Sequence, residues 1–324
     1  MKKSAIRFAA LAISALAISG PAAADLPPLE MKERYKVGFP QMESNNPWRI
    51  AETKSFQDTA ESCGWDLVTT DAAGSAAKQV ADVDSMIAQG IDVLFLPPRE
   101  EKPLIPAVMR ARAAGIPTFL VDRSVDPNVA RAGEHYVAFL GSDFVDQGRR
   151  VAEWTLENFE GEEGVIIELE GTTGSSPAND RRKGFDDVMA MHDNMTIVAS
   201  QTGDFARDLG RQVMETLLQA HPDVNIVYAH NDEMAIGAIQ ALELAGRKPG
   251  EDVLVVSIDG TRDALQAITD GKMGVTVESS PFFGPLACET MKRYANGEEI
   301  EPWVKVEDRI FTIENAADHI DEAY

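Results

Sequence analysis

Residues 226–260 read IVYAHNDEMAIGAIQALELAGRKPGEDVLVVSIDG. The apolar runs 226–228 and 253–258 have the length of buried strands, and a helical pattern at 232–245 lies between them. A strand, a helix and a second strand in this order form a unit whose two strands lie parallel, with the helix packed on the sheet. This stretch therefore predicts an α/β fold.

The same alternation continues on both sides of this unit. Further strands are predicted at 35–39, 65–70, 93–96, 118–121, 137–141, 164–169, 196–200 and 274–278. Helical patterns separate them at 47–63, 76–89, 104–114, 143–159, 177–191, 206–220 and 262–271. Ten strands would make a long single sheet, and a break between the two series of strand and helix patterns falls at 141–143. We therefore expect two doubly wound parallel-sheet lobes, each covered by helices on both faces.

The end of the chain does not fit a simple division in two. A helical pattern at 281–296 and short apolar runs at 304–306 and 310–313 follow the second series of strands. They predict that the chain crosses between the lobes more than once and forms a multi-strand hinge. The expected N-terminal lobe is 25–142 plus 280–308, and the expected C-terminal lobe is 143–279 plus 309–324.

Residues 1–24 have the features of a cleavable signal peptide. Lys2, Lys3 and Arg7 precede an apolar run over 8–18, and the segment ends in three alanines at 22–24. The run is too short to span a bilayer, although a buried N-terminal helix is an alternative. No cysteine follows it until Cys63, so a periplasmic product without a lipid anchor is expected.

The charge balance excludes two classes of partner. The chain has 30 Lys and Arg against 53 Asp and Glu, a formal net charge of −23, and loss of the three basic residues with the signal peptide makes it −26. Nucleic acids and anionic lipids are bound mainly through Lys and Arg, so neither is expected as a partner. Cys63 and Cys288 are the only cysteines, and their spacing does not tell whether they pair.

Polar and aromatic residues gather immediately after the predicted strands. In open parallel sheets, ligands bind outside the carboxyl ends of the strands. The candidate ligand-binding residues there are Asn46, Trp48, Arg49, Asp122, Arg123, Arg181, Phe205, Asn231 and Asp259. Four further candidates rank lower: Glu43, Asp180, Glu278 and Ser279.

These residue types fit a small neutral polyol. Carboxylates such as Asp122 and Asp259 accept hydrogen bonds from hydroxyls, and arginine forks donate them. Trp48 and Phe205 are suited to cover the apolar C–H faces of a sugar ring. Alternatively, Trp48 and Phe205 are core residues and Asp122–Arg123 is a surface ion pair.

Several motifs in this order resemble one family. They are Asn46-Pro47-Trp48, Asp122-Arg123-Ser124, Arg181-x-x-Gly184-Phe185, Gly203-Asp204-Phe205-x-Arg207, Asn231-Asp232-Glu233-Met234-Ala235 and Ile258-Asp259-Gly260. The chain resembles the periplasmic sugar-binding proteins of ABC transporters, in the ribose- and galactofuranose-binding branch. This resemblance implies the type I periplasmic binding protein fold, a monosaccharide ligand, ABC permease subunits as partners, and all the higher-ranked site residues above except Arg49. It also implies a monomer without cofactor or metal.

The resemblance leaves the sugar open. The run Trp48-Arg49-x-Ala51-Glu52 is most similar to the galactofuranose binders, whereas ribose binders have a second aromatic residue where this chain has Arg49. Glu278 and Ser279 stand where ribose binders have a glutamine. Galactofuranose is therefore the first expectation, followed by arabinose, galactose, ribose and other pentoses or hexoses.

Other functions are weighed against this one. The five histidines show no metal-binding spacing, and no GxSxG, Walker or GxGxxG motif occurs, so no enzyme is expected. A secreted hydrolase with an unfamiliar carboxylate pair is a remote alternative. The main alternative is a sugar-sensing protein that presents its closed form to a chemoreceptor or histidine kinase. A sugar-responsive repressor would need an N-terminal helix-turn-helix, and the signal peptide takes that place.

Overall fold

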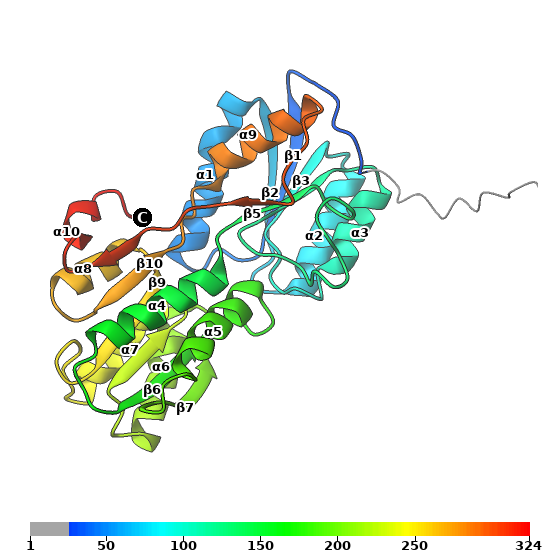
Figure 1. Cartoon of the computed structure of the whole chain (residues 1–324). Helices are drawn as coiled ribbons and strands as arrows, with labels where there is room; N and C mark the ends of the chain where they lie inside the picture. The colour runs from blue at the N-terminus through cyan, green and yellow to red at the C-terminus, as the bar shows by residue number, and fades with distance from the viewer. Residues whose placement is uncertain (1–25) are drawn as a thin grey trace, which may run out of the picture.

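The computed structural model describes residues 26–324, and the predicted signal peptide lies outside the described residues. Within 26–324, no helix is both long enough and apolar enough to cross a membrane. The described chain forms two α/β lobes, blue to cyan and green to yellow in Figure 1.

The N-terminal lobe is built on one six-stranded sheet with the strand order β11-β5-β4-β3-β1-β2. Its strands are β1 (Tyr35–Gln41), β2 (Trp65–Asp71), β3 (Val93–Leu96), β4 (Thr118–Val121), β5 (Ala138–Gly141) and β11 (Trp303–Lys305). Its helices are α1 (Pro47–Cys63), α2 (Ala76–Ala88), α3 (Ile105–Ala113) and α9 (Phe283–Ala295).

Helices cover both faces of this sheet. Alternate residues of each strand point to opposite faces, so both sets of side chains are buried under helices. On β3, Val93 and Phe95 join the core shared with α1 and α9, whereas Leu94 and Leu96 join the core shared with α2 and α3. All four side chains are buried, which explains the unbroken apolar run in the sequence.

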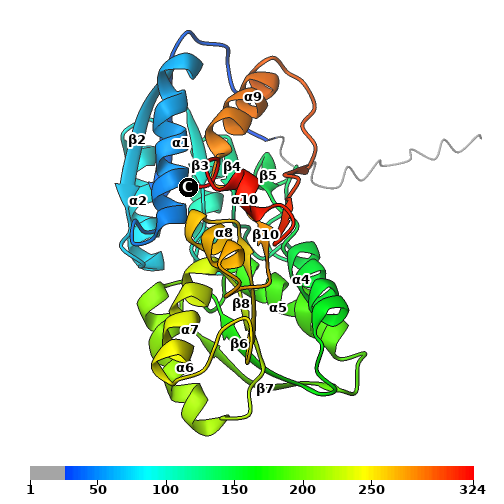
Figure 2. The ribbon, with the colours of Figure 1, turned by 90° about the vertical axis from the view of Figure 1, so that its left-hand side faces the viewer.

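The C-terminal lobe repeats this plan, with the strand order β12-β10-β9-β8-β6-β7. Its strands are β6 (Gly164–Glu170), β7 (Met195–Thr202), β8 (Ile226–Ala229), β9 (Leu254–Asp259), β10 (Val275–Glu278) and β12 (Ile310–Thr312). Its helices are α4 (Phe144–Asn158), α5 (Ser176–Met189), α6 (Arg207–Ala220), α7 (Asp232–Leu244), α8 (Arg262–Thr269) and α10 (Ala316–His319). Figure 2 shows the lobes one above the other, with α1 and α9 in the upper lobe and α6 and α7 in the lower.

The predicted fold class is confirmed, with one departure. The strand β12 runs antiparallel to β10, whereas the sequence predicted parallel sheets. The reason lies in the last crossover. Strand β11 runs parallel to β5 toward the cleft between the lobes, and the chain continues in the same direction into the other lobe. Strand β12 therefore runs away from the cleft, whereas its neighbour β10 runs toward it.

The chain passes between the two sheets at three places, namely 142–143, 279–282 and 306–309. The second passage returns the chain to the N-terminal lobe, where α9 packs beside α1 (Figure 1). A disulfide between Cys63 and Cys288 joins these two helices, with a Cα–Cα distance of 5.9 Å. The bond fixes the returning helix to a lobe whose other helices are formed by the first third of the chain.

Candidate ligand pocket

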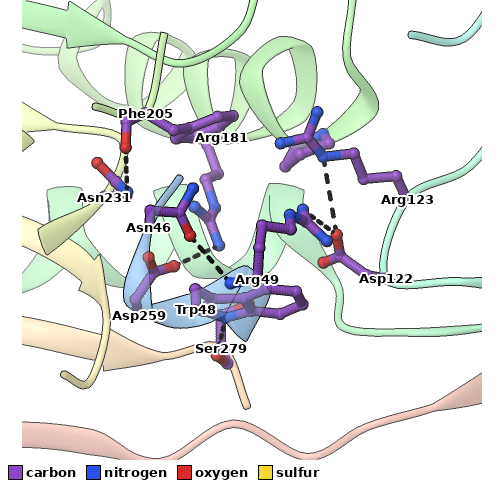
Figure 3. Close-up of a pocket in the computed structure, with 11 residues that line it drawn as sticks. Asn46, Trp48, Arg49, Asp122, Arg123, Arg181, Phe205, Asn231, Asp259 and Ser279 are labelled. Atoms are coloured by element: carbon purple, nitrogen blue, oxygen red, sulfur yellow. Dashed lines mark hydrogen bonds and ion pairs between the residues drawn. The ribbon is translucent and has the colours of Figure 1, made fainter. Parts of the chain in front are cut away.

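A pocket lies between the lobes where the carboxyl ends of both sheets meet, and Figure 3 shows its lining side chains. About 320 Å³ of space not occupied by atoms lies within the pocket and at its opening. The lining residues are Asn46, Trp48, Arg49, Asp122, Arg123, Pro177, Arg181, Phe205, Asn231, Asp259 and Ser279.

The start of α1 places three of these residues. Asn46 caps the helix, because its side-chain oxygen accepts a hydrogen bond from the backbone N–H of Arg49, and Pro47 takes the first helical position. The first turn of the helix then carries Trp48 and Arg49 into the pocket. The Trp48 Nε1–H donates to the carbonyl of Ser279 at 2.7 Å, which joins this turn to the second crossover.

Arg49 is held between two carboxyl groups of the N-terminal lobe. Its Nη1 donates to Glu52 Oε2 at 2.9 Å and its Nη2 to Asp122 Oδ2 at 2.5 Å. Its guanidinium carbon also lies 4.3 Å from the centre of the Trp48 ring, within the range of a cation–π contact. Burial raises the pKa of Glu52 to about 7, and Asp122 adds to the rise while Arg49 opposes it. Arg49 is thus fixed in position and has little freedom left.

Arg123 is buried with fewer partners. Its Nη1 donates to the carbonyl of Arg99 at 2.9 Å, but its Nε has no hydrogen-bond partner and lies 3.7 Å from Asp122 Oδ2. Burial lowers the pKa of this guanidinium to about 9, and the positive charge of Arg49 lowers it further. A donor left unpaired in a buried site favours a ligand that supplies an acceptor.

Arg181 of the C-terminal lobe uses its donors within the protein. Its Nε donates to Gln147 Oε1 at 3.0 Å, its Nη1 to the carbonyl of His230 at 2.6 Å and its Nη2 to Asp259 Oδ1 at 3.2 Å. Burial raises the pKa of Asp259 well above its usual range, and Arg181 opposes this rise. The C-terminal half of the pocket is therefore oriented before any ligand arrives.

The remaining C-terminal residues complete this half. Asn231 caps α7 by accepting from the N–H of Met234 at 3.0 Å, and its amide nitrogen donates to the carbonyl of Phe205 at 3.2 Å. The Phe205 ring centre lies 5.2 Å from the guanidinium carbon of Arg123 and 5.9 Å from that of Arg181. Phe205 thus contacts cations of both lobes.

Backbone conformation marks the same region. Among residues 26–324, five non-glycine residues have a positive φ, and three of them, Asp122 (59°), Phe205 (58°) and Asp259 (134°), line the pocket. A fourth, Asp204 (52°), directly precedes Phe205. Such conformations cost about 1 to 3 kcal/mol each and concentrate at functional sites.

The structure brings together ten of the thirteen candidates, namely the nine of higher rank and Ser279, and adds Pro177. Pro177 was missed although Ser175-Ser176-Pro177 follows β6 as a helix start, a position that could have indicated it. The role of these residues as ligand contacts stays a prediction.

Three candidates lie outside the pocket. Glu43 pairs with Arg99 at 2.9 Å, and Glu278 pairs with Nε of Arg309 at 2.7 Å. Asp180 lines a separate cavity beside Asp143, and burial, with the charge of Asp143, raises its pKa to about 6. In each case the residue follows a strand or begins a helix as expected, but its side chain turns to another partner or cavity.

Sequence reasoning also missed a polar network at the hinge. Gln147 accepts from Arg181 and donates to Asp308 Oδ2 at 2.9 Å and to the carbonyl of Glu278 at 3.2 Å. Asp308 Oδ1 in turn accepts from the hydroxyl of Ser142 at 2.8 Å. One pocket residue is thus connected with all three crossovers. Within 26–324, no group of three or more His, Cys, Asp or Glu is arranged to hold a metal ion.

Comparison with known proteins agrees with this geometry. The model of the periplasmic binding protein domain matches residues 37–299. The chain is 38% identical to the galactofuranose-binding protein YtfQ of Escherichia coli K12, over 80% of this chain and 81% of that protein. It is 33% identical to the ribose import binding protein RbsB of Bacillus subtilis 168, over 83% and 85% of the two chains.

A solved structure shares the arrangement of the lobes. The periplasmic binding protein component of the arabinose ABC transporter from Shewanella sp. ANA-3, bound to α- and β-L-arabinofuranose, superposes with a TM-score of 0.83 and 36% identity. The superposition covers 89% of this chain and 95% of that one. With its two lobes, its pocket between them and a domain match over most of its length, this chain belongs to the periplasmic binding protein family.

Proposed function

We propose that this protein captures one monosaccharide between its lobes and delivers it to the permease of an ABC importer. The observation that carries the proposal is a single pocket in which both lobes supply planar donors, carboxyl acceptors and an aromatic ring. Each sugar hydroxyl both donates and accepts hydrogen bonds, so a buried sugar needs donors and acceptors side by side.

The electrostatics of the pocket favour a neutral ligand. The lowered pKa of Arg123 means that further positive charge is unfavourable there, because the group already lies near Arg49 in a buried place. Burial also raises the pKa values of Asp259 in the pocket and of Glu52 beside it, so negative charge is unfavourable there as well. A sugar supplies many hydrogen-bonding groups and no net charge.

Galactofuranose or a related pentose or hexose is the sugar we propose. The support is the likeness to a galactofuranose binder and to a structure that holds arabinofuranose. We expect Asp259 and Asn231 of the C-terminal lobe to contact the ligand on one side, and Arg123 and Trp48 of the N-terminal lobe to contact it on the other. Two carboxyls, three guanidiniums and two amides would then select sugars by the pattern of their hydroxyls.

Import is proposed over sensing because the similar protein RbsB is an import binding protein by name. We further propose that the protein acts as a periplasmic monomer after removal of residues 1–24, and that it is not an enzyme. Its lobes, 25–142 with 280–308 and 143–279 with 309–324, would close on the ligand by bending at the three crossovers.

Calorimetric titration with D-galactose, L-arabinose, D-ribose and D-fructose tests this function. We expect at least one sugar to bind with micromolar or tighter affinity, and mass spectrometry of the purified protein to identify a retained ligand. Asp259→Asn should weaken binding at least tenfold, while Asp180→Asn, a matched change outside the pocket, should leave it unchanged. Binding no tighter than millimolar for every sugar would refute the proposal.

A further inference from the structure

Arg99 connects the two lobes outside the ligand pocket. It follows β3 in the N-terminal lobe, and its Nη2 lies 3.3 Å from both carboxylate oxygens of Asp204 in the C-terminal lobe. On its own lobe, its Nη1 donates to Glu43 Oε2 at 2.9 Å, and its Nε lies 3.9 Å from Glu100 Oε1. The Arg99 side chain is 10% exposed and that of Asp204 is 38% exposed, so water reaches mainly the acidic partner.

This ion pair differs from the other contacts between the lobes. Among residues 26–324, it is the one ion pair that joins the lobes away from the crossovers. Three hydrogen bonds also join the lobes on this side, from Glu101 N to the Gly174 carbonyl, from Ser124 N to Ser176 Oγ and from Asn179 Nδ2 to Glu101 Oε2, each at 2.9 Å. In the described part of the chain, the Arg99–Asp204 contact alone pairs opposite full charges between the lobes away from the crossovers.

Arg99 also contacts the surroundings of the pocket on both sides. Its carbonyl accepts from Arg123, and its side chain binds the residue that precedes Phe205. Asp204 and Phe205 both have φ values in the left-handed region, at 52° and 58°, so the turn that presents the Phe205 ring is a strained one. Fixing Asp204 therefore fixes the turn that carries the aromatic residue of the C-terminal lobe.

We propose that Arg99 and Asp204 form a latch, an ion pair made when the lobes close, and that this latch sets the affinity and residence time of the ligand without touching it. The inference rests on the proposed closing of the lobes. In an open form Arg99 keeps Glu43 as a partner, whereas Asp204 returns to water. The gain on closure is thus one further carboxylate beside Arg99, in addition to Glu43 and Glu100 of its own lobe.

The latch has a consequence that direct ligand contacts do not have. Attraction between partly exposed charges weakens as ionic strength rises, because the Debye length falls from about 30 Å at 0.01 M to about 3 Å at 1 M. Binding of an uncharged sugar should therefore depend on salt through this pair. Repulsion between the two acidic lobes also depends on salt, so a control of equal charge is required.

Asp204→Asn tests the latch, with Asp208→Asn as the matched control. Asparagine tolerates the left-handed conformation at 204, so the turn is retained. Asp208 lies four residues away on the same lobe, is exposed and makes the same change in net charge. Stopped-flow tryptophan fluorescence with L-arabinose and D-galactose would give the rate and equilibrium constants at 20 mM and 500 mM KCl.

The latch predicts a three- to tenfold weaker affinity for Asp204→Asn at 20 mM KCl, mainly through faster dissociation, and a ratio to wild type that falls toward one at 500 mM. Asp208→Asn should follow wild type at both salt concentrations. Equal effects of the two variants, or a salt-independent ratio, would overturn the latch.

A second measurement separates failure of the latch from failure of the proposed function. Because the latch stabilises the closed form in the absence of ligand as well, small-angle X-ray scattering of the ligand-free protein should give a larger radius of gyration for Asp204→Asn than for Asp208→Asn. If the wild-type protein binds neither sugar, the radii of gyration alone test the latch. Equal radii for the two variants would refute it.

Discussion

The two lobes share one strand order, yet their halves of the pocket are prepared differently. In the C-terminal half, Arg181 has a protein partner for Nε, Nη1 and Nη2. In the N-terminal half, Arg123 is buried with an unpaired Nε. The difference indicates that Arg181 is oriented in advance, whereas Arg123 keeps a donor that the protein leaves unpaired.

The lobes also differ in what holds their cores together. Both lobes have a stacked aromatic pair, with ring centres 4.1 Å apart for Phe39 and Phe56 and 3.9 Å apart for Phe185 and Tyr228, but the disulfide between α1 and α9 belongs to the N-terminal lobe. In the C-terminal lobe the buried carboxyl of Asp232 connects neighbouring segments, accepting from Thr276 Oγ1 at 2.8 Å and from the N–H of Thr261 at 2.7 Å. The N-terminal lobe is thus cross-linked by a covalent bond, whereas in the C-terminal lobe hydrogen bonds to a buried carboxyl connect neighbouring segments.

The largest effect should follow from removing the covalent bond. Cys63→Ala with Cys288→Ala should lower the free energy of unfolding by about 4 kcal/mol, because the closed loop is long. The N-terminal lobe should then unfold first. Urea titration followed by tryptophan fluorescence reports mainly this lobe, which holds Trp48, Trp65 and Trp303, while circular dichroism reports both. Coincident transitions at the wild-type midpoint would contradict this expectation.

A pair of arginine variants compares the two halves of the pocket. Arg123→Ala and Arg181→Ala should each weaken sugar binding at least 100-fold. Without ligand, Arg181→Ala should lower stability by about 3 kcal/mol, because Asp259 is left buried without its cation. Arg123→Ala should leave the melting temperature of the empty protein unchanged or higher, since a poorly paired buried charge is removed.

Differential scanning calorimetry and titration on both variants measure these two quantities. Equal destabilisation by the two substitutions would mean that both arginines are structural and that the halves do not differ.

The smallest expected effect is a difference between the lobes in how their stability depends on pH. A raised carboxyl pKa in the folded protein means that stability increases as pH falls through the folded value. Glu52, with a pKa of about 7, should add about 1 kcal/mol between pH 8 and pH 6. Asp232 of the C-terminal lobe, whose pKa burial raises to about 6, should act below pH 6.

Chemical denaturation across this range checks both parts. Glu52→Gln should remove the gain between pH 8 and pH 6 and keep the gain below pH 6. An unaltered profile in Glu52→Gln would show that other groups cause the dependence.

The pocket was predictable because its residues follow strands, and parallel strands of one sheet end at the same edge. Arg123 and Asp259 were found in this way. The same rule also selected Glu43 and Glu278, because it places a residue near the cleft without telling which arginine its side chain meets. Arg99 and Arg309, the arginines that pair with them, carry no local signal of that role.

Contacts distant in sequence were not predictable. Gln147 lies inside α4 like any polar helix residue, and its partner Asp308 comes 161 residues later. The pairing of Cys63 with Cys288 and the reversal of β12 likewise depend on how the chain returns through the hinge. Such features follow from the assembled topology and not from any local pattern.

The position of the disulfide bears on the order in which the molecule can be completed as the chain is synthesised. Cys288 is added 225 residues after its partner, and α9 and β11 also come late. Most of the C-terminal lobe, from α4 to β10, is by then already available to fold as a unit. The lobe that starts first is therefore completed late, and only β12 and α10 of the other lobe follow its last strand.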